Sequence, residues 1–138
     1  MRGHRVMAGT RAGFTLIELL IVVIIIAALA AMVAPRLIER GEEAKANIAK
    51  GDLASLTLAI KLYRLDNGRY PSSLADLLAA PSGARNWKGP YIENEALDPW
   101  GEAYRFKHPG VRNKSGFDIY SIGADGQEGT ADDVGNWK

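Results

Sequence analysis

The chain has 138 residues, a formal net charge of +1 and no cysteine. This length is enough for one domain with a modest core, and the lack of cysteine excludes disulfides, thiolate catalysis and cysteine-ligated metal sites. Arg2, Arg5 and Arg11 lie within residues 1–13, which contain no acid, so the rest of the chain has a small net negative charge. A nucleic-acid-binding protein usually carries a basic face, so the charge distribution argues against that class.

An apolar run from Phe14 to Ala34 follows, and its only strongly polar residues are Thr15 and Glu18. About 20 apolar residues in a helix span the hydrocarbon core of a bilayer. The arginines before the run predict that the leader stays on the cytoplasmic side. A secretory signal peptide cut near the small residues 27–31 is a weaker alternative, because such signals have a shorter apolar region.

Glu18 is an acid near the start of this predicted membrane helix. An ionisable residue inside a membrane is costly and by default marks a function or a partner. Cleavage between Gly13 and Phe14 would create an α-amine on Phe14, and this cation could pair with Glu18 of a neighbouring chain. The alternative is a carboxylate near the lipid headgroups that costs little and has no role.

The segment from Gly13 to Glu18 (GFTLIE), between a basic leader and an apolar run, resembles the class III signal of type IV pilins and type II secretion pseudopilins. The resemblance implies that a prepilin peptidase cuts after Gly13 and methylates the new N-terminal Phe14. It also implies that Glu18 is the acid used in filament assembly. The domain organisation would then be a leader (1–13), a transmembrane and assembly half of a long helix (14–35) and a periplasmic domain (36–138).

Pro35 lies in the middle of this long helix and predicts a kink or an opened turn. Beyond it, one apolar face is predicted to pack on the domain, because its residues recur at helical spacing. That face consists of Ala49, Leu53, Leu56, Ile60 and Tyr63. Gly41 and Gly51 weaken the helix by about 1 kcal/mol each relative to alanine, and residues 66–68 (DNG) predict its end. The charged residues of the opposite side predict either a solvated face or contacts between protomers.

The remaining elements are a short helix and a hairpin. Ser73 is predicted to cap the short helix with Asp76 as its partner, and its buried face would contain Leu74, Leu77 and Leu78. Residues 103–107 and 117–122 predict an antiparallel hairpin. The fold class is therefore α+β, with a long N-terminal helix on a small antiparallel sheet and irregular loops, and the resemblance implies the type IV pilin-like fold.

Four further segments narrow the resemblance to the major pseudopilin family of the type II secretion system. They are DNGRYP from Asp66, WKGPYI from Trp87, DPWG from Asp98 and YSIGADG from Tyr120. The resemblance implies a structural subunit, not an enzyme, that polymerises with itself into a periplasmic pseudopilus and helps to drive folded proteins across the outer membrane. Its other implied partners are minor pseudopilins, the prepilin peptidase and the inner-membrane assembly platform.

Residues 121–135 hold several acids and glycines close together. Calcium binds six to eight hard oxygens from carboxylates and backbone carbonyls, and Asp125, Asp132 and Asp133 could supply three of them. The spacing is not that of an EF-hand. The alternative is a turn rich in Asp and Gly that binds no metal.

For this segment the resemblance implies a calcium site. Its ligands would be the three aspartates and the backbone carbonyls of Ile122 and Gln127, with Glu128 as a possible substitute for Gln127.

The sequence gives little support for a catalytic function. The serines have no histidine partner at motif spacing, His4 and His108 stand alone, and no glycine-rich phosphate loop follows a strand. Two alternatives to the pseudopilin stay open. One is a type IV pilin used for adhesion, motility or DNA uptake, and the other is a single-span periplasmic calcium-binding protein that never polymerises.

Overall fold

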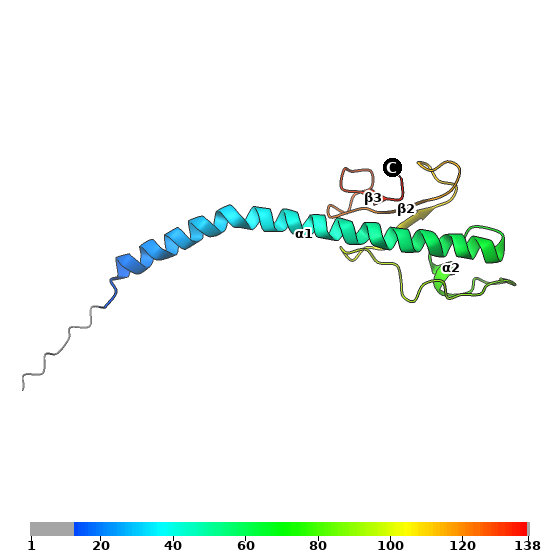
Figure 1. The fold of residues 1–138 in the computed structure, drawn as a ribbon, viewed down its shortest axis with the longest axis horizontal. Helices are drawn as coiled ribbons and strands as arrows, with labels where there is room; N and C mark the ends of the chain where they lie inside the picture. Colours follow the sequence, from blue (N-terminus) through cyan, green and yellow to red (C-terminus); the bar gives the residue numbers. More distant parts are fainter. Residues whose placement is uncertain (1–12, 138) are drawn as a thin grey trace, which may run out of the picture. The chain divides into compact units, whose positions relative to one another are not determined.

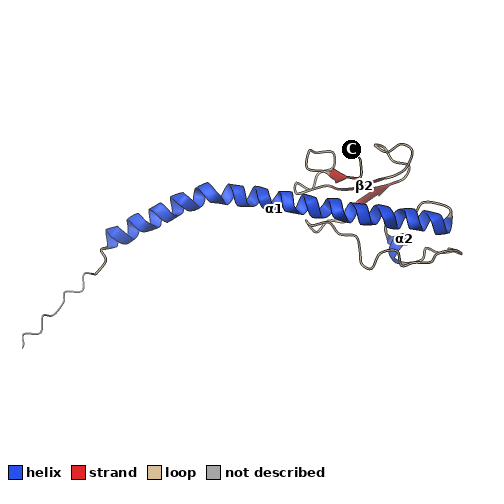
Figure 2. Ribbon diagram, in the orientation of Figure 1, coloured by secondary structure: helices blue, strands red, loops and turns tan. Residues whose placement is uncertain are grey.

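The computed structural model describes residues 13–137. Residues 1–12 and 138, and with them the arginines and His4 of the leader, lie outside the described residues. The elements follow one another in the order α1, α2, β1, β2, β3 (Figure 1, Figure 2). The chain divides into two compact units, Met1–Glu39 and Arg40–Lys138.

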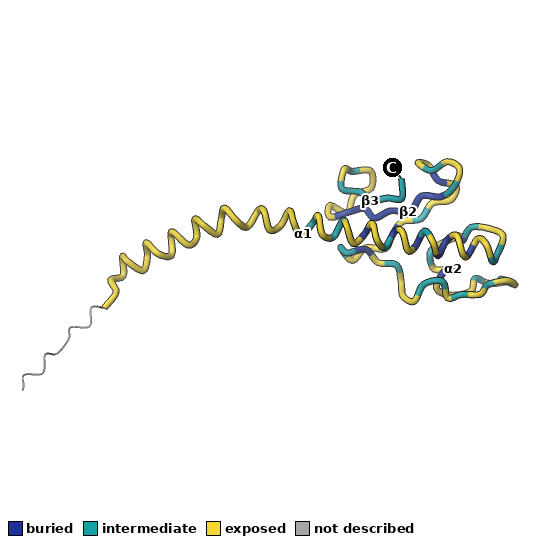
Figure 3. Tube along the Cα trace, viewed as in Figure 1, coloured by how far each residue is buried: buried dark blue, intermediate teal, exposed yellow. Residues whose placement is uncertain are grey.

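Helix α1 (Leu16–Asn67) begins in the first unit. Its apolar residues there are exposed to solvent, which is the yellow stretch of α1 in Figure 3. By length and composition α1 could cross a membrane. It continues through Pro35 without a break in the helical segment, and the kink or opened turn expected at Pro35 stays a prediction.

The predicted end of α1 is confirmed. The helix stops at Asn67, and Gly68 follows with φ 71°. The Gly68 N–H donates to the Arg64 carbonyl at 2.8 Å. Glycine adopts this left-handed conformation without a steric penalty, which makes it a common residue at helix ends.

The core of the second unit lies against one face of α1. The face predicted from the apolar spacing is buried, and Ala59 is buried with it. Leu77 of α2 (Ala75–Leu78) packs against this face together with Tyr104, Phe117 and Ile119. Burial of apolar side chains contributes most of the stabilisation of a domain of this size.

The sheet has three antiparallel strands in the order β1 (Arg105–Lys107), β2 (Asp118–Ser121), β3 (Val134–Gly135). The predicted hairpin is confirmed, with shorter strands. β2 is central and buried at every position. β3 was not predicted, because a two-residue strand has no periodicity of its own. Its pairing with β2 brings the end of segment 121–135 back to the sheet.

Asp118 organises the loop between β1 and β2. It is buried, and its carboxylate accepts the backbone N–H groups of Val111 (2.7 Å), Arg112 (2.8 Å) and Asn113 (2.8 Å). Burial by itself raises the pKa of Asp118, but the hydrogen bonds from Arg112, Asn113 and Val111 together lower it below its usual value. The loop therefore wraps around an ionised carboxylate.

Two predictions about α2 are wrong. No side-chain hydrogen bond caps this described helix, so Ser73 is not its N-cap. Asp76 Oδ2 instead accepts the backbone N–H of Ser72 at 2.7 Å and that of Ser73 at 3.4 Å. Leu77 is buried, whereas Leu78 is exposed, because a helix of one turn turns only part of its surface towards the core.

Candidate functional site

Two segments hold the residues singled out from the sequence, and the first is the start of α1. Phe14 is 88% exposed and precedes the helix. Thr15 Oγ1 accepts the backbone N–H of Glu18 at 3.2 Å, which is one half of a capping box. Glu18 thus lies in the first turn, where the helix dipole favours an acid. This role of Thr15 was not predicted, although the T-x-x-E spacing of the sequence signals it.

The second segment is the loop between β2 and β3. Its three aspartates each accept a backbone N–H of the loop itself. Asp125 Oδ1 accepts from Gln127 at 2.8 Å, Asp132 Oδ2 from Asp125 at 3.0 Å, and Asp133 Oδ2 from Gly129 at 2.8 Å. These carboxylates therefore hold the backbone of the loop in its turns.

Glycines allow these turns. Gly123, Gly126 and Gly129 have φ of 66°, 66° and 92°, a region that other residues rarely adopt. A Cβ at Gly123 would also clash with the Asp132 carboxylate. The loop conformation thus depends on glycine for its backbone, and at Gly123 for space as well.

Thr130 is a further residue of this loop, and its role was not predicted. Its hydroxyl contacts Asp132 Oδ1 at 2.6 Å and the Gln127 carbonyl at 3.1 Å. Hydrogen bonds from Thr130 and from the Asp125 backbone N–H hold the pKa of Asp132 below its usual value. The hydroxyl has a single proton, and its shorter contact with Asp132 leaves the carbonyl oxygen of the predicted ligand Gln127 without this donor.

The oxygen groups of this loop are of the kind that calcium binds, but its side chains are not grouped as a metal site. Within residues 13–137, no three acidic, histidine or cysteine side chains are grouped so that they could hold a metal ion. Asp133 Oδ1, however, is buried and has no hydrogen-bond partner, and an unpaired buried oxygen is costly unless a cation or water contacts it. Carboxylates and carbonyls are the oxygen ligands that calcium prefers.

Glu128 does not turn towards these aspartates. Its carboxylate accepts the Tyr120 hydroxyl at 2.7 Å and forms an ion pair with Lys107. Lys107, and to a lesser degree Tyr120, lower the pKa of Glu128 below its usual value. Because Lys107 is on β1 and Tyr120 on β2, Glu128 fastens the loop to the sheet.

The turn of residues 98–101 joins this loop region to α1. Asp98 is buried and accepts the N–H groups of Trp100 (3.0 Å) and Glu102 (2.9 Å) as well as the Ser121 hydroxyl (2.5 Å). The Trp100 indole N–H donates to Glu42 Oε2 at 2.6 Å. The turn was predicted, but these long-range contacts were not.

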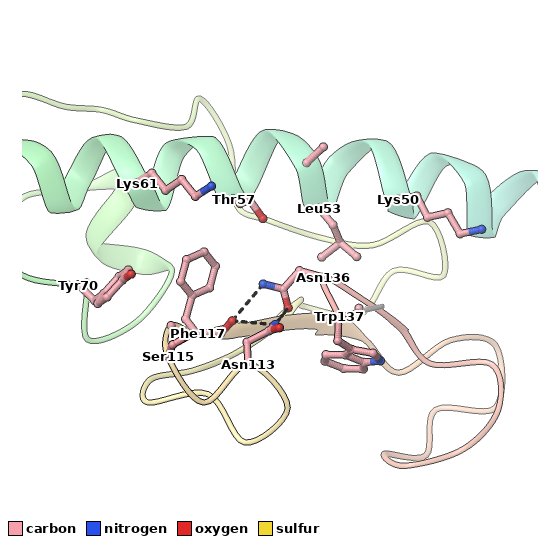
Figure 4. A pocket seen from close by; sticks show the side chains of 13 residues that line it. Lys50, Leu53, Thr57, Lys61, Tyr70, Asn113, Ser115, Phe117, Asn136 and Trp137 are labelled. Carbon is pink, nitrogen blue, oxygen red and sulfur yellow. Dashed lines mark hydrogen bonds between the residues drawn. The ribbon is translucent and has the colours of Figure 1, made fainter.

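A groove of about 620 Å³ lies between α1 and the loops that follow β1 and β3 (Figure 4). Lys50 and Lys61 stand on its helix side, and Asn113 and Asn136 form a hydrogen bond of 3.0 Å opposite them. None of its described lining residues is an acid or a histidine.

Two family models match the chain. One is described as type II secretion system (T2SS), protein G, and matches residues 36–137. The other is the prokaryotic N-terminal methylation motif and matches residues 9–34. The two matches lie side by side along the sequence and together take in most of the chain.

The chain is similar to curated proteins named type II secretion system core protein G. It is 44% identical to that of Pseudomonas aeruginosa (92% of this chain, 95% of the relative) and 41% identical to that of Klebsiella pneumoniae (91% and 93%). The structure resembles the crystal structure of the major pseudopilin from the type 2 secretion system of enterohaemorrhagic Escherichia coli. The TM-score is 0.65 at 36% identity, over 73% of this chain and 89% of the other.

Proposed function

Because this chain belongs to the type II secretion system protein G family, we propose that it is the major subunit of a periplasmic pseudopilus, a filament of copies of itself that helps to drive folded proteins across the outer membrane. The observation that carries this proposal is the agreement of the family match over residues 36–137 with the pilin-like fold. The surface-pilus subunit and the non-polymerising single-span protein are not favoured, since the relatives reported above are type II secretion proteins.

The processing of the chain follows from its N-terminal segment. A prepilin peptidase cuts after Gly13 and methylates Phe14, and the apolar helix of residues 14–35 stays in the inner membrane with residues 36–138 in the periplasm. The methylation motif over residues 9–34 and the apolar length of α1 support this proposal.

Assembly moves the apolar half of α1 from lipid into a bundle of neighbouring helices. This transfer gains little hydrophobic free energy, because lipid tails are as apolar as the helices. The α-amine of Phe14 and the carboxylate of Glu18 from a neighbouring copy then set the register. The filament also engages minor pseudopilins and the assembly platform of the inner membrane, which this family implies.

A calcium ion bound in segment 121–135 would stabilise the domain. Asp125, Asp132 and Asp133 would hold it, with the carbonyls of Ile122 and Gln127. The buried, unpartnered Asp133 Oδ1 supports this proposal. The ion would supply positive charge to a loop whose carboxylates otherwise repel one another.

The test is an intact mass with N-terminal fragmentation on the protein extracted, with its filaments, from the cell envelope of cells that carry the secretion machinery. We expect a chain that starts at methylated Phe14. Filaments whose subunits still carry Met1–Gly13 would contradict the processing route, and wild-type cells without filaments would contradict the filament itself.

A further inference from the structure

Thr130 lies between two of the oxygens that we propose as calcium ligands. Its hydroxyl oxygen is 2.6 Å from Asp132 Oδ1 and 3.1 Å from the Gln127 carbonyl oxygen. The hydroxyl carries the only proton among these three oxygens, because an ionised carboxylate and a carbonyl are acceptors alone. The shorter distance assigns this proton to Asp132. Thr130 therefore donates to an oxygen that a bound cation would also contact.

The carboxylate of Asp132 is held at both of its oxygens. Oδ2 accepts the backbone N–H of Asp125 at 3.0 Å, and Oδ1 accepts the hydroxyl of Thr130. A Cβ at Gly123 would clash with the same carboxylate, so the backbone of Gly123 lies directly against it. The contact at Oδ2 comes from the backbone, whereas the contact at Oδ1 comes from a side chain that can rotate.

The hydrogen bond from Thr130 belongs to a strong class. Hydrogen bonds from a hydroxyl to a carboxylate are short, with oxygen–oxygen distances of about 2.5–2.7 Å, and the distance here lies in that range. Calcium prefers carboxylate oxygens at about 2.3–2.6 Å. Both the hydroxyl proton and the ion are attracted by the same negative charge, and they repel each other.

We propose that the hydroxyl of Thr130 competes with calcium for Asp132. It holds this carboxylate and the turn around it when no ion is bound, and it gives up Asp132 Oδ1 when the ion binds. This inference rests on the proposed function, since it concerns the calcium site of segment 121–135. Thr130 is only partly buried, so a change of its side-chain rotamer frees the oxygen without a movement of the backbone.

A competitor differs from a ligand and from a purely structural contact in what its removal does. Loss of a ligand would weaken calcium binding. Loss of a structural contact would destabilise the domain equally with and without the ion. Loss of a competitor destabilises the domain only without calcium, and it makes calcium bind more tightly because the ion no longer displaces a hydrogen bond.

Thr130→Val tests the proposal, with Thr130→Ser as its matched control. Valine keeps the shape of threonine without the hydroxyl, whereas serine keeps the hydroxyl without the methyl group. The measurement is isothermal titration calorimetry of the full chain in detergent, stripped of ions by a chelator and titrated with calcium chloride. We expect Thr130→Val to bind calcium about tenfold more tightly than the wild type, because a hydrogen bond to a charged group is worth about that factor. Thr130→Ser should bind it like the wild type.

Melting curves of the same proteins separate competition from a structural role. In chelator, Thr130→Val should melt below the wild type, and in saturating calcium the two should melt at the same temperature. An equal loss in both conditions would assign Thr130 a structural role and overturn the proposal. A serine variant that behaved like the valine variant would assign the effect to the methyl group and overturn it as well.

Two calorimetric results distinguish a failure of this inference from a failure of the proposed calcium site. A wild type that binds calcium as tightly as Thr130→Val, or more tightly, would overturn the competition alone. A wild type that binds no calcium would contradict the calcium site itself, and the competition with it.

Discussion

Trp100 donates its indole N–H to Glu42 Oε2 at 2.6 Å, across 58 positions of the sequence. The contact joins the turn of residues 98–101 to the part of α1 where the second unit begins. Hydrogen bonds from Trp100 and Lys45 lower the pKa of Glu42 below its usual value, so the acceptor is ionised at neutral pH. Asp98 in the same turn accepts the hydroxyl of Ser121 on β2. The turn is therefore the link between α1 and the central strand.

Trp100→Phe removes the donor of this link and keeps an aromatic ring. We expect a lower melting temperature for the full chain in detergent, because the Glu42 carboxylate loses a charged hydrogen bond. Glu42→Gln is the control. It keeps an acceptor oxygen and should lower the melting temperature less than Trp100→Phe. A larger loss for Glu42→Gln would mean that the charge of Glu42, and not the contact with Trp100, holds the turn.

Acid should weaken the loop around Asp118. The folded-state pKa of this carboxyl lies below its unfolded value of about 3.9, because backbone N–H groups favour the ionised form. Its contribution to the free energy of unfolding is therefore fully present above the unfolded pKa and is lost as the pH falls through the folded pKa. Unfolding by urea at pH 7 and near pH 2 measures this loss.

Asp118→Asn shows whether that carboxyl is responsible. The amide keeps only one acceptor oxygen for three N–H donors, so we expect a loss of about 1–3 kcal/mol at pH 7. The difference between variant and wild type should shrink as the pH falls through the folded-state pKa of the wild-type carboxyl, which lies below its usual value. A difference of the same size at both pH values would assign the effect to packing and not to ionisation.

Glu18→Ala should leave membrane insertion intact and abolish filaments. The variant keeps the cap of α1, since Thr15 accepts the backbone N–H of residue 18 and not its side chain. The loss would therefore report the carboxylate alone. Membrane fractionation measures insertion, and the yield of filaments isolated from the cell envelope measures assembly. Glu18→Asp keeps the charge on a shorter side chain and should retain part of the yield, whereas normal filaments from Glu18→Ala would remove the pairing with Phe14.

Calcium should raise the melting temperature of the full chain, and a chelator should lower it. At a free concentration one hundred times the dissociation constant, binding adds about 2.7 kcal/mol to the free energy of unfolding. Asp133→Asn should abolish the response, because it removes the ionised carboxylate that holds the unpartnered oxygen. Melting curves with calcium, magnesium or chelator check this.

Glu128→Gln is the matched control for calcium, since Glu128 contacts Lys107 and Tyr120 and not the aspartates. It should lower the melting temperature in chelator and keep the shift caused by calcium. Identical melts of the wild type with and without calcium would remove the metal from the proposal.

The buried face of α1, the end of α1 and the β1–β2 hairpin could be predicted from the sequence, because each depends on spacing or turn chemistry within a few residues. The helical spacing of Leu53 and Ile60 predicts that both are buried. The residue type of Gly68 predicts the end of α1. The cap of α2 could not be predicted in this way. Ser73 is of a residue type that commonly caps helices, but its side chain makes no cap to α2. The carboxylate of Asp76 instead accepts the backbone N–H of Ser72 just before this one-turn helix.

The apolar segments, the end of the long helix and the acids gathered in residues 121–135 follow from the order of residues alone. The pairing of β3 with β2, the contacts of Glu128 with Lys107 and Tyr120, and the hydrogen bond from Trp100 to Glu42 depend on how the elements pack. Local patterns depend on residues a few positions apart, so they can be recognised in the sequence directly. Contacts between distant residues depend on how the elements pack. Several acids of this chain could bind the same partner by their chemistry, and the packing selects which one does.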